Sequence, residues 1–155
     1  MCGIAGTLHF DINRSVDKAT LQAMTNVLSH RGPDGEGYYI DKNIGLGHKR
    51  LAVIDLSTGA QPMVSEDKKL VVVFNGEIYN YIELKEELKS SGHRFDSTSD
   101  TEVILKAYEE WGFECQNKFN GMWAFAIWDA RQRHLFLSRD RIGEKPMHYS
   151  LRDNS

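Results

Sequence analysis

Met122-Trp123-Ala124-Phe125-Ala126-Ile127-Trp128 is the stretch that decides the fold, because it is apolar at every position. An element without a polar face is expected to be buried on both faces. Periodicity alone does not separate a strand from a helix here, but the aromatic residues, the preceding Gly121 and a turn over residues 129–133 favour a strand. Such a strand needs a covering layer on each side, so helices are expected over the far face of at least one sheet.

The elements around this strand follow an irregular order. Further strands are expected over residues 4–10, 38–40, 44–56, 70–74 and 134–139. Helices are expected over residues 17–30, 80–91 and 99–112, and the last two begin with the capping-box patterns Asn80-x-x-Glu83 and Ser99-x-x-Glu102. The order is strand, helix, several strands, two helices, several strands. This predicts an α+β fold in which two sheets stack between helical layers.

The chain has 155 residues, which is the size of one domain, and it has no linker-like segment. Hydrophobic residues make up 41% and charged residues 26%, so a disordered chain is excluded. The net charge of −3 argues against nucleic-acid binding, and no apolar run approaches the ~20 residues of a membrane span. The N-terminus lacks the regions of a signal peptide, and the two cysteines form no pair typical of a disulfide scaffold or metal site. We therefore expect a soluble, cytoplasmic domain.

Cys2 directly follows the initiator methionine. A methionine before a residue as small as cysteine is normally removed, which would leave a first residue that carries both a thiol and a free α-amine. An α-amine has a pKa of about 7.7–8.0, so part of it is neutral near physiological pH and can act as the base that activates the thiol. The alternative is that Cys2 has no chemical role.

Asn75-Gly76-Glu77 follows the predicted strand over residues 70–74. The Asn75 amide and the Gly76 N–H are two donors that could converge on one oxygen, and one such donor can be worth about 10²–10³-fold in rate. The alternative is an ordinary Asn-Gly turn, although such a turn usually joins two strands and a helix follows here.

Charged residues near these segments offer contacts for an amino acid. Arg50 could pair with a carboxylate, and Glu77 with Asp100 could bind an ammonium. The alternatives are a surface arginine and a favourable charge at a helix N-terminus. His30 and His48 lack metal-ligand spacing and indicate structural or solvent roles, and Cys115 is expected to be a small buried hydrophobe. An arginine cluster near the C-terminus is expected to be solvated surface; it consists of Arg131, Arg133, Arg139 and Arg141.

Seven motifs, in order along nearly the whole chain, resemble the glutaminase domain of glutamine-hydrolysing asparagine synthetases, which are class II glutamine amidotransferases. They are Met1-Cys2-Gly3-Ile4-Ala5-Gly6, His30-Arg31-Gly32-Pro33-Asp34, Arg50-Leu51-Ala52-Val53-Ile54-Asp55, Phe74-Asn75-Gly76-Glu77-Ile78-Tyr79-Asn80, Ser99-Asp100-Thr101-Glu102-Val103-Ile104-Leu105, Asn120-Gly121-Met122-Trp123-Ala124-Phe125-Ala126 and Arg139-Asp140-Arg141-Ile142-Gly143-Glu144-Lys145-Pro146. Any one of them is a weak signal, but seven in register are specific.

The resemblance implies the N-terminal nucleophile hydrolase fold, with two stacked antiparallel sheets between helical layers. It implies that Cys2 is the nucleophile and that Asn75 and Gly76 form the oxyanion hole. It also implies that glutamine is bound by Arg50, Glu77 and Asp100, with a pocket lined by Leu51, Ala52, Val53 and Ile54. The implied reaction is hydrolysis of glutamine to glutamate and ammonia, and it needs no metal or organic cofactor.

The resemblance covers residues 1–155 as one glutaminase domain. The ATP-dependent synthetase domain of the family, where ATP and Mg²⁺ would be used and aspartate is the default acceptor, is absent from this sequence. We expect it as a partner, in the same chain or a separate one, and a homo-oligomer stays open. The alternative function is a non-catalytic module that senses glutamine or binds a partner. Cys2 argues against this alternative, because a site without catalytic activity need not keep its nucleophile.

Overall fold

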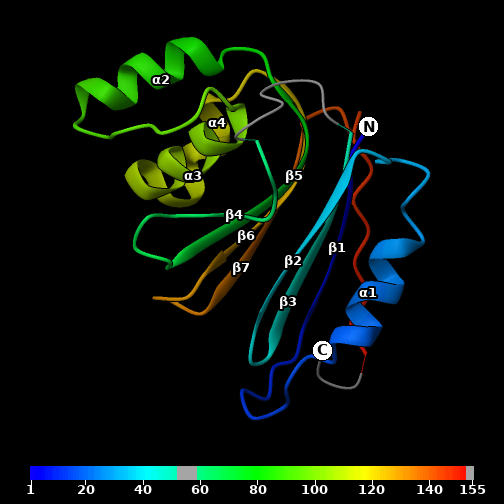
Figure 1. Cartoon of the computed structure of the whole chain (residues 1–155). Helices are drawn as coiled ribbons and strands as arrows, with labels where there is room; N and C mark the ends of the chain where they lie inside the picture. The colour runs from blue at the N-terminus through cyan, green and yellow to red at the C-terminus, as the bar shows by residue number, and fades with distance from the viewer. Residues whose placement is uncertain (52–58, 153–155) are drawn as a thin grey trace.

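Two antiparallel sheets stack face to face in the computed structural model, which describes residues 1–51 and 59–152 (Figure 1). The first sheet has the order β1-β3-β2 and consists of β1 (Gly3–Leu8), β2 (Gly35–Asp41) and β3 (Ile44–Arg50). The second has the order β4-β5-β6-β7 and consists of β4 (Met63–Val64), β5 (Leu70–Ile78), β6 (Gly121–Asp129) and β7 (His134–Arg139).

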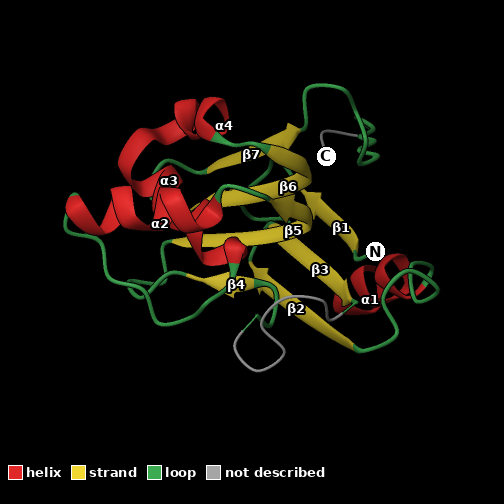
Figure 2. Ribbon diagram, turned by 90° about the horizontal axis from the view of Figure 1, so that it is seen from above, coloured by secondary structure: helices red, strands yellow, loops and turns green. Residues whose placement is uncertain are grey.

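Helices cover the outer face of each sheet. The first sheet is covered by α1 (Lys18–Asn26), which packs on β1 and β3. The second is covered by α2 (Tyr81–Ser90), α3 (Asp100–Trp111) and the short α4 (Cys115–Lys118), with a 3₁₀ turn over Gly112–Glu114 between α3 and α4. The view from above shows α1 on one side of the sheets and the other helices on the opposite side (Figure 2). The predicted α+β fold, with two stacked antiparallel sheets between helical layers, is confirmed.

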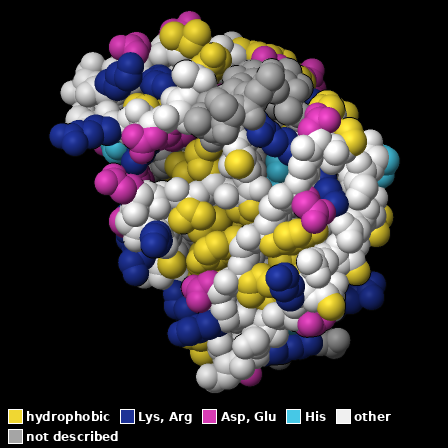
Figure 3. All heavy atoms as spheres, in the orientation of Figure 1, with side chains coloured by type: hydrophobic (Ala, Val, Ile, Leu, Met, Phe, Trp, Pro, Cys, Tyr) yellow, Lys and Arg dark blue, Asp and Glu magenta, His cyan; other side chains and the backbone are white. Residues whose placement is uncertain are grey.

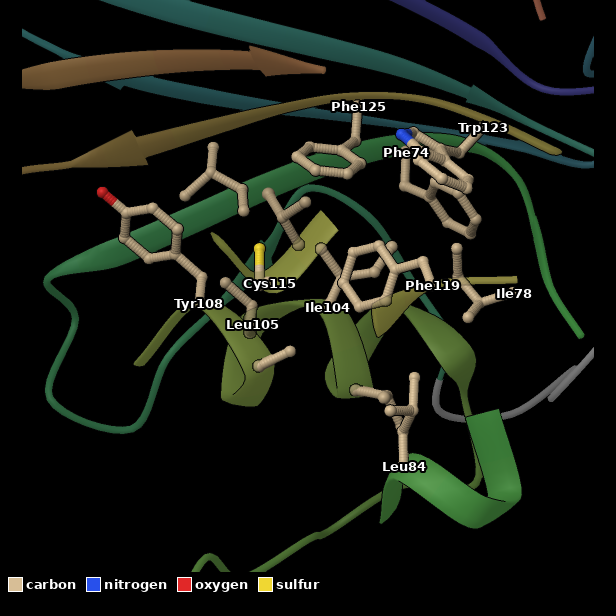
Figure 4. Close-up of a cluster of buried hydrophobic side chains, with 14 of the residues drawn as sticks. Phe74, Ile78, Leu84, Ile104, Leu105, Tyr108, Cys115, Phe119, Trp123 and Phe125 are labelled. Carbon is tan, nitrogen blue, oxygen red and sulfur yellow. The ribbon is translucent and has the colours of Figure 1, made fainter. Parts of the chain in front are cut away.

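The apolar strand β6 lies in the middle of the core, and its two faces serve different layers. Trp123, Phe125 and Ile127 pack against the helices, while Ala126 and Trp128 pack between the sheets. The helix side of this core is drawn in Figure 4, where Phe125 and Trp123 lie above side chains from the helices. Fully burying one such large side chain contributes roughly 1.5–3 kcal/mol to folding. The prediction that both faces of this strand are buried is therefore confirmed.

Several boundaries differ from the prediction because tertiary contacts set them. The strand predicted to end at Phe74 continues to Ile78, since its pairing with β6 runs on to Gly121. The strand predicted over residues 44–56 ends at Arg50 within the described chain. The helix predicted to reach residue 30 ends at Asn26, after which the backbone forms tighter turns. The two-residue β4 was not predicted, because two residues carry no periodicity.

Of the two predicted capping boxes, the one at α3 forms only in part and the one at α2 does not form. Ser99 caps α3 by accepting the N–H of Thr101, but Glu102 does not reach back to Ser99 and instead accepts N–H groups of residues 96 and 97. At α2 the prediction is wrong. The Asn80 side chain makes no cap bond, because it donates to the carbonyl of Lys118 and accepts the N–H of Asn120. It thereby ties the start of α2 to the segment before β6.

The surface carries both signs of charge. On the face drawn in Figure 3, acidic and basic side chains are interspersed, and apolar side chains gather in the middle, where the two sheets meet. Among the described residues, no helix is long and apolar enough to cross a membrane.

The predicted surface position of the arginine cluster is confirmed, because all four side chains are exposed. They also make specific contacts: Arg131 pairs with Asp67, and Arg139 and Arg141 donate to backbone carbonyls of the loops beside β6 and β7. Arg133 donates to Asn43 and lies over the Trp128 ring. These guanidinium groups therefore hold loops and strands together.

Candidate active site

A cavity of about 140 Å³ lies at one end of the sandwich, where the N-terminus, the end of β3, the second half of β5 and the first turn of α3 meet. In Figure 1 this is the end marked by the N label. All the predicted site residues that the structure describes line it, namely Cys2, Arg50, Leu51, Asn75, Gly76, Glu77 and Asp100. Ala52, Val53 and Ile54 lie outside the described residues. The cavity thus brings together predicted site residues that are up to 98 positions apart in the sequence.

Cys2 lies immediately before β1 and is held against the residue that follows β3. Its thiol donates to the carbonyl oxygen of Leu51 at 3.6 Å, and its sulfur accepts the N–H of Leu51 at 3.4 Å. The guanidinium of Arg31 donates to the Cys2 carbonyl oxygen at 3.0 Å. These contacts fix both the backbone and the thiol of Cys2 at the mouth of the cavity.

Arg31 is a site residue that sequence reasoning missed. It belongs to the Arg-Gly-Pro-Asp motif, and the sequence alone indicates no role for this arginine. The following Gly32 lies so close to β3 that a Cβ would come within 2.4 Å of the Lys49 backbone. This close approach holds the motif near β3, and Arg31 reaches Cys2 from there.

Asn75 and Gly76 lie inside β5 and not after it, which corrects the predicted position and excludes the Asn-Gly turn. In an antiparallel strand, alternate residues direct their N–H groups to the same edge. The N–H of Phe74 bonds the Gln61 side chain and the N–H of Ile78 bonds the Asp100 carboxylate. The N–H of Gly76 lies between them on this same edge, which faces the cavity.

Glycine is required at position 76 for a steric reason. A Cβ there would come within 2.1 Å of the Met122 carbonyl oxygen and 2.7 Å of the Phe74 ring. Asn75, the other predicted donor, is buried with an exposed fraction of 4%. Both residues therefore lie within the ladder that pairs β5 with β6.

Asp100 is a buried carboxyl in the first turn of α3. Burial and the neighbouring Glu77 carboxylate together raise its pKa to about 6, against the lowering effect of backbone N–H donors such as that of Ile78 at 3.1 Å. With Arg50 at the end of β3 and with Lys145, the cavity carries one guanidinium, one ammonium and two carboxylates. This set of charges complements the carboxylate and the ammonium of a free amino acid.

His48 and Gln61 hold the backbone of Phe74 in place. His48 Nε2 donates to the Phe74 carbonyl at 3.2 Å, and Gln61 Oε1 accepts the Phe74 N–H at 2.6 Å. Burial lowers the pKa of His48 to about 4, so its ring is neutral and its structural role is confirmed. Gln61 also donates to Thr101 at 3.3 Å, which links β5 to α3. Gln61 was not predicted, because a lone glutamine before a proline carries no distinctive signal.

The arrangement can support nucleophilic chemistry on a small zwitterion. It combines a thiol, backbone and amide donors beside it, and charged groups for a carboxylate and an ammonium. No cluster of three or more potential metal ligands occurs in the described parts of the chain. Cys115 is buried under the helices, where burial raises its pKa to about 12, so its predicted place in the core is confirmed.

Comparisons with known proteins identify relatives of the whole chain. The family model described as "Glutamine amidotransferase domain" matches residues 1–155. "Asparagine synthetase [glutamine-hydrolyzing] 3" of Bacillus subtilis is 43% identical over 157 residues, which cover 100% of this chain and 26% of the relative. "Putative asparagine synthetase [glutamine-hydrolyzing] 2" of Methanocaldococcus jannaschii is 46% identical over 168 residues, which cover 96% of this chain and 32% of the relative.

Among solved structures, the glutamine phosphoribosylpyrophosphate amidotransferase of B. subtilis has a similar fold. The TM-score is 0.65 at 21% identity, over 84% of this chain and 35% of that one. At this identity the likeness shows the fold alone. The chain spans only about a quarter to a third of the length of the two curated relatives.

Proposed function

This chain belongs to the glutamine amidotransferase domain family, and we propose that it hydrolyses glutamine to glutamate and ammonia through a thioester on Cys2. One observation carries the proposal. Cys2, the cavity-facing edge of β5 at Gly76, and the charges of Arg50, Glu77 and Asp100 surround a single cavity. Each matches one need of the reaction: a nucleophile, an oxyanion donor, and contacts for the α-carboxylate and α-ammonium of glutamine.

In the proposed complex, Arg50 pairs with the α-carboxylate of glutamine, and Asp100 and Glu77 bind the α-ammonium. Leu51, which follows Arg50, lines the pocket. The side-chain amide then lies at Cys2, with its carbonyl oxygen toward Asn75 and the Gly76 N–H. The position of Cys2 Sγ beside the Leu51 backbone supports this orientation, because it places the thiol next to the residue that directly follows Arg50.

The reaction starts when the Cys2 thiol gives its proton to the α-amine that removal of Met1 exposes. Sγ bonds to the amide carbon, and the carbonyl oxygen takes the electron pair as an oxyanion held by Asn75 and Gly76. Cleavage of the C–N bond releases ammonia, which takes the proton from the amine. Water then adds to the thioester, releases glutamate and restores the thiol.

This half-reaction needs no cofactor. The greater length of the relatives supports a further proposal, that the ammonia is passed to an ATP-dependent synthetase domain in the same or a separate chain. ATP and Mg²⁺ would act only there. The names of the relatives support asparagine as the product, and we infer aspartate as the acceptor.

The test uses the protein with Met1 removed, as intact mass shows. Wild-type protein is expected to release glutamate and to gain the mass of a glutamine-analogue electrophile such as 6-diazo-5-oxo-norleucine. Cys2→Ala is expected to lose both, while Cys115→Ala is the matched control that keeps both, because that thiol is buried in the core. Glutamate release by Cys2→Ala, or glutamine binding by the wild type without turnover, would refute the proposal.

A further inference from the structure

The turn that follows β7 is braced from both sides, and the proposed reaction gives it no role. Asp140 accepts the N–H groups of Trp123, Glu144 and Lys145 at 2.8–3.2 Å. Burial alone would raise the pKa of Asp140, but these N–H donors hold the pKa below its ordinary value. Arg139 donates to the carbonyls of Lys145 and Gly143 at 2.7 and 2.6 Å. The Arg139–Lys145 motif is therefore a rigid bracket that fixes the position of Lys145.

Gly143 is part of this bracket for two reasons. Its φ is +74°, a conformation that L side chains rarely adopt. A Cβ there would also come within 2.4 Å of the Arg139 guanidinium. The bracket therefore depends on a glycine at this position and on Arg139 closing over it.

Lys145 is buried in the same cavity as Cys2. Its exposed fraction is 5%, and its Nζ donates to the Met1 thioether at 3.0 Å. Within residues 1–51 and 59–152, the structure gives the ammonium no other hydrogen bond and no carboxylate within 4.0 Å. A thioether is a weak acceptor, and burying an unpaired charge costs several kcal/mol. Packing alone would be served as well by an apolar side chain, so the ammonium points to a role in the cavity.

The contact with Met1 places this charge at the N-terminus. Removal of Met1 takes away the thioether and leaves Nζ without that acceptor, in the cavity that the new first residue also lines. The other charged groups around that residue are Arg31, which donates to the Cys2 carbonyl, Arg50 at the end of β3, and the carboxylates Glu77 and Asp100. The carboxylates are the proposed partners of the substrate ammonium, and Arg50 is the proposed partner of its carboxylate. Arg31 is bound to the Cys2 carbonyl, so Lys145 is the cation of the cavity to which the proposed complex gives no partner.

We propose that Lys145 is a positioning residue of the glutaminase reaction, whose ammonium faces the α-amine of the chain that begins at Cys2 and disfavours protonation of that amine. A nearby like charge makes a second positive charge unfavourable, and within about 4–6 Å the effect is worth about one pH unit or more. More of the amine is then neutral and able to take the thiol proton at neutral pH. This inference rests on the proposed function of Cys2.

The test follows the α-amine directly. The chain has two cysteines, so ¹⁵N-cysteine labelling gives one amine signal from Cys2 and one backbone amide signal from Cys115 as a reference. In the wild type, the amine is expected to titrate at a lower pH when folded than in urea. Lys145→Met and Lys145→Gln are expected to raise the folded midpoint by about one pH unit. The lower limb of the kcat/KM profile for glutamine should move with it.

Two control variants separate charge from packing. Lys145→Arg keeps the charge and is expected to keep the wild-type midpoint, and Glu144→Gln changes an exposed neighbour in the same turn and is expected to change nothing. A wild-type amine that titrates no lower when folded than in urea would overturn the inference, and so would a neutral variant that folds and keeps the midpoint. A shifted amine in a protein that releases no glutamate would instead refute the proposed function.

Discussion

Asp100→Asn should make the empty protein more stable and, at the same time, unable to bind glutamine. Asp100 is almost completely buried and lies beside Glu77, and both features disfavour its ionised form. In the proposed complex the substrate ammonium relieves this cost. The ionised Asp100 carboxylate therefore lowers the free energy of unfolding of the unliganded protein, and substrate binding removes this destabilisation.

The magnitude follows from the raised pKa. Burial moves the pKa of Asp100 from 3.8 to about 6, so the unfolded chain is ionised at a pH where the folded one still holds its proton. At pH 8 the free energy of unfolding of the wild type is therefore about 3 kcal/mol lower than that of a chain with a neutral side chain at position 100. At pH 5 this difference is about half as large. The stability of the wild type relative to the variant thus rises as the pH falls from about 6 toward 4. For binding, only about one site in ten is ionised at pH 5, so KM for glutamine should rise about tenfold from pH 8.

Urea unfolding of both proteins at pH 8 and pH 5 measures the first effect, and glutamate release over the same range measures the second. Asp96→Asn is the matched control, because it removes the same charge from an exposed position near the start of α3. The reasoning fails if Asp100→Asn is no more stable than the wild type at pH 8. It also fails if the wild-type KM is flat down to pH 5.

Three further predictions concern the other walls of the cavity. Arg50→Ala should raise KM for glutamine about 10- to 100-fold with little change in kcat. The reason is that a charged hydrogen bond of about 1.5–3 kcal/mol is lost equally from the ground state and the transition state. A fall in kcat alone would contradict this role of Arg50. Gly76→Ala should lower kcat about 10²- to 10³-fold and lower the melting temperature, because a Cβ within 2.1 Å of a β6 carbonyl must separate the strands; an active, stable variant would refute the assignment. Gln61→Leu should cost about 1–3 kcal/mol in urea unfolding by orphaning the Phe74 N–H, whereas Gln61→Glu keeps the acceptor and should cost less.

The layered architecture was predictable where a continuous run of residues shared one property. The apolar run at residues 122–128 was sufficient to require layers on both sides, and the structure has them. The ends of the helices and strands were not predictable from the sequence, because they depend on partners that are distant in the chain. Nothing in residues 70–78 says that pairing continues past Phe74, since that depends on Gly121 lying opposite Ile78.

The site shows the same division. Residues within recognisable motifs, such as Cys2 and Asp100, were singled out, and the structure places them in one cavity. Arg31 and Lys145 lie in quoted motifs, but their side chains reach Cys2 and Met1 only through contacts across the fold. The carboxylate of Glu102 looks like half of a capping box, yet it bonds the loop before α3. Side-chain partners of this kind are set by three-dimensional packing and leave no local pattern.

The shortness of β4 has a consequence for where chemistry can occur at all. Its ladder to β5 continues no further than the pair of Met63 and Val72, four residues before Gly76. Had β4 been as long as its neighbour, a backbone carbonyl would have taken the Gly76 N–H as an ordinary rung of the sheet. The proposed oxyanion donor is thus an N–H on the part of the β5 edge that β4 does not reach, because β4 pairs with β5 only as far as Val72.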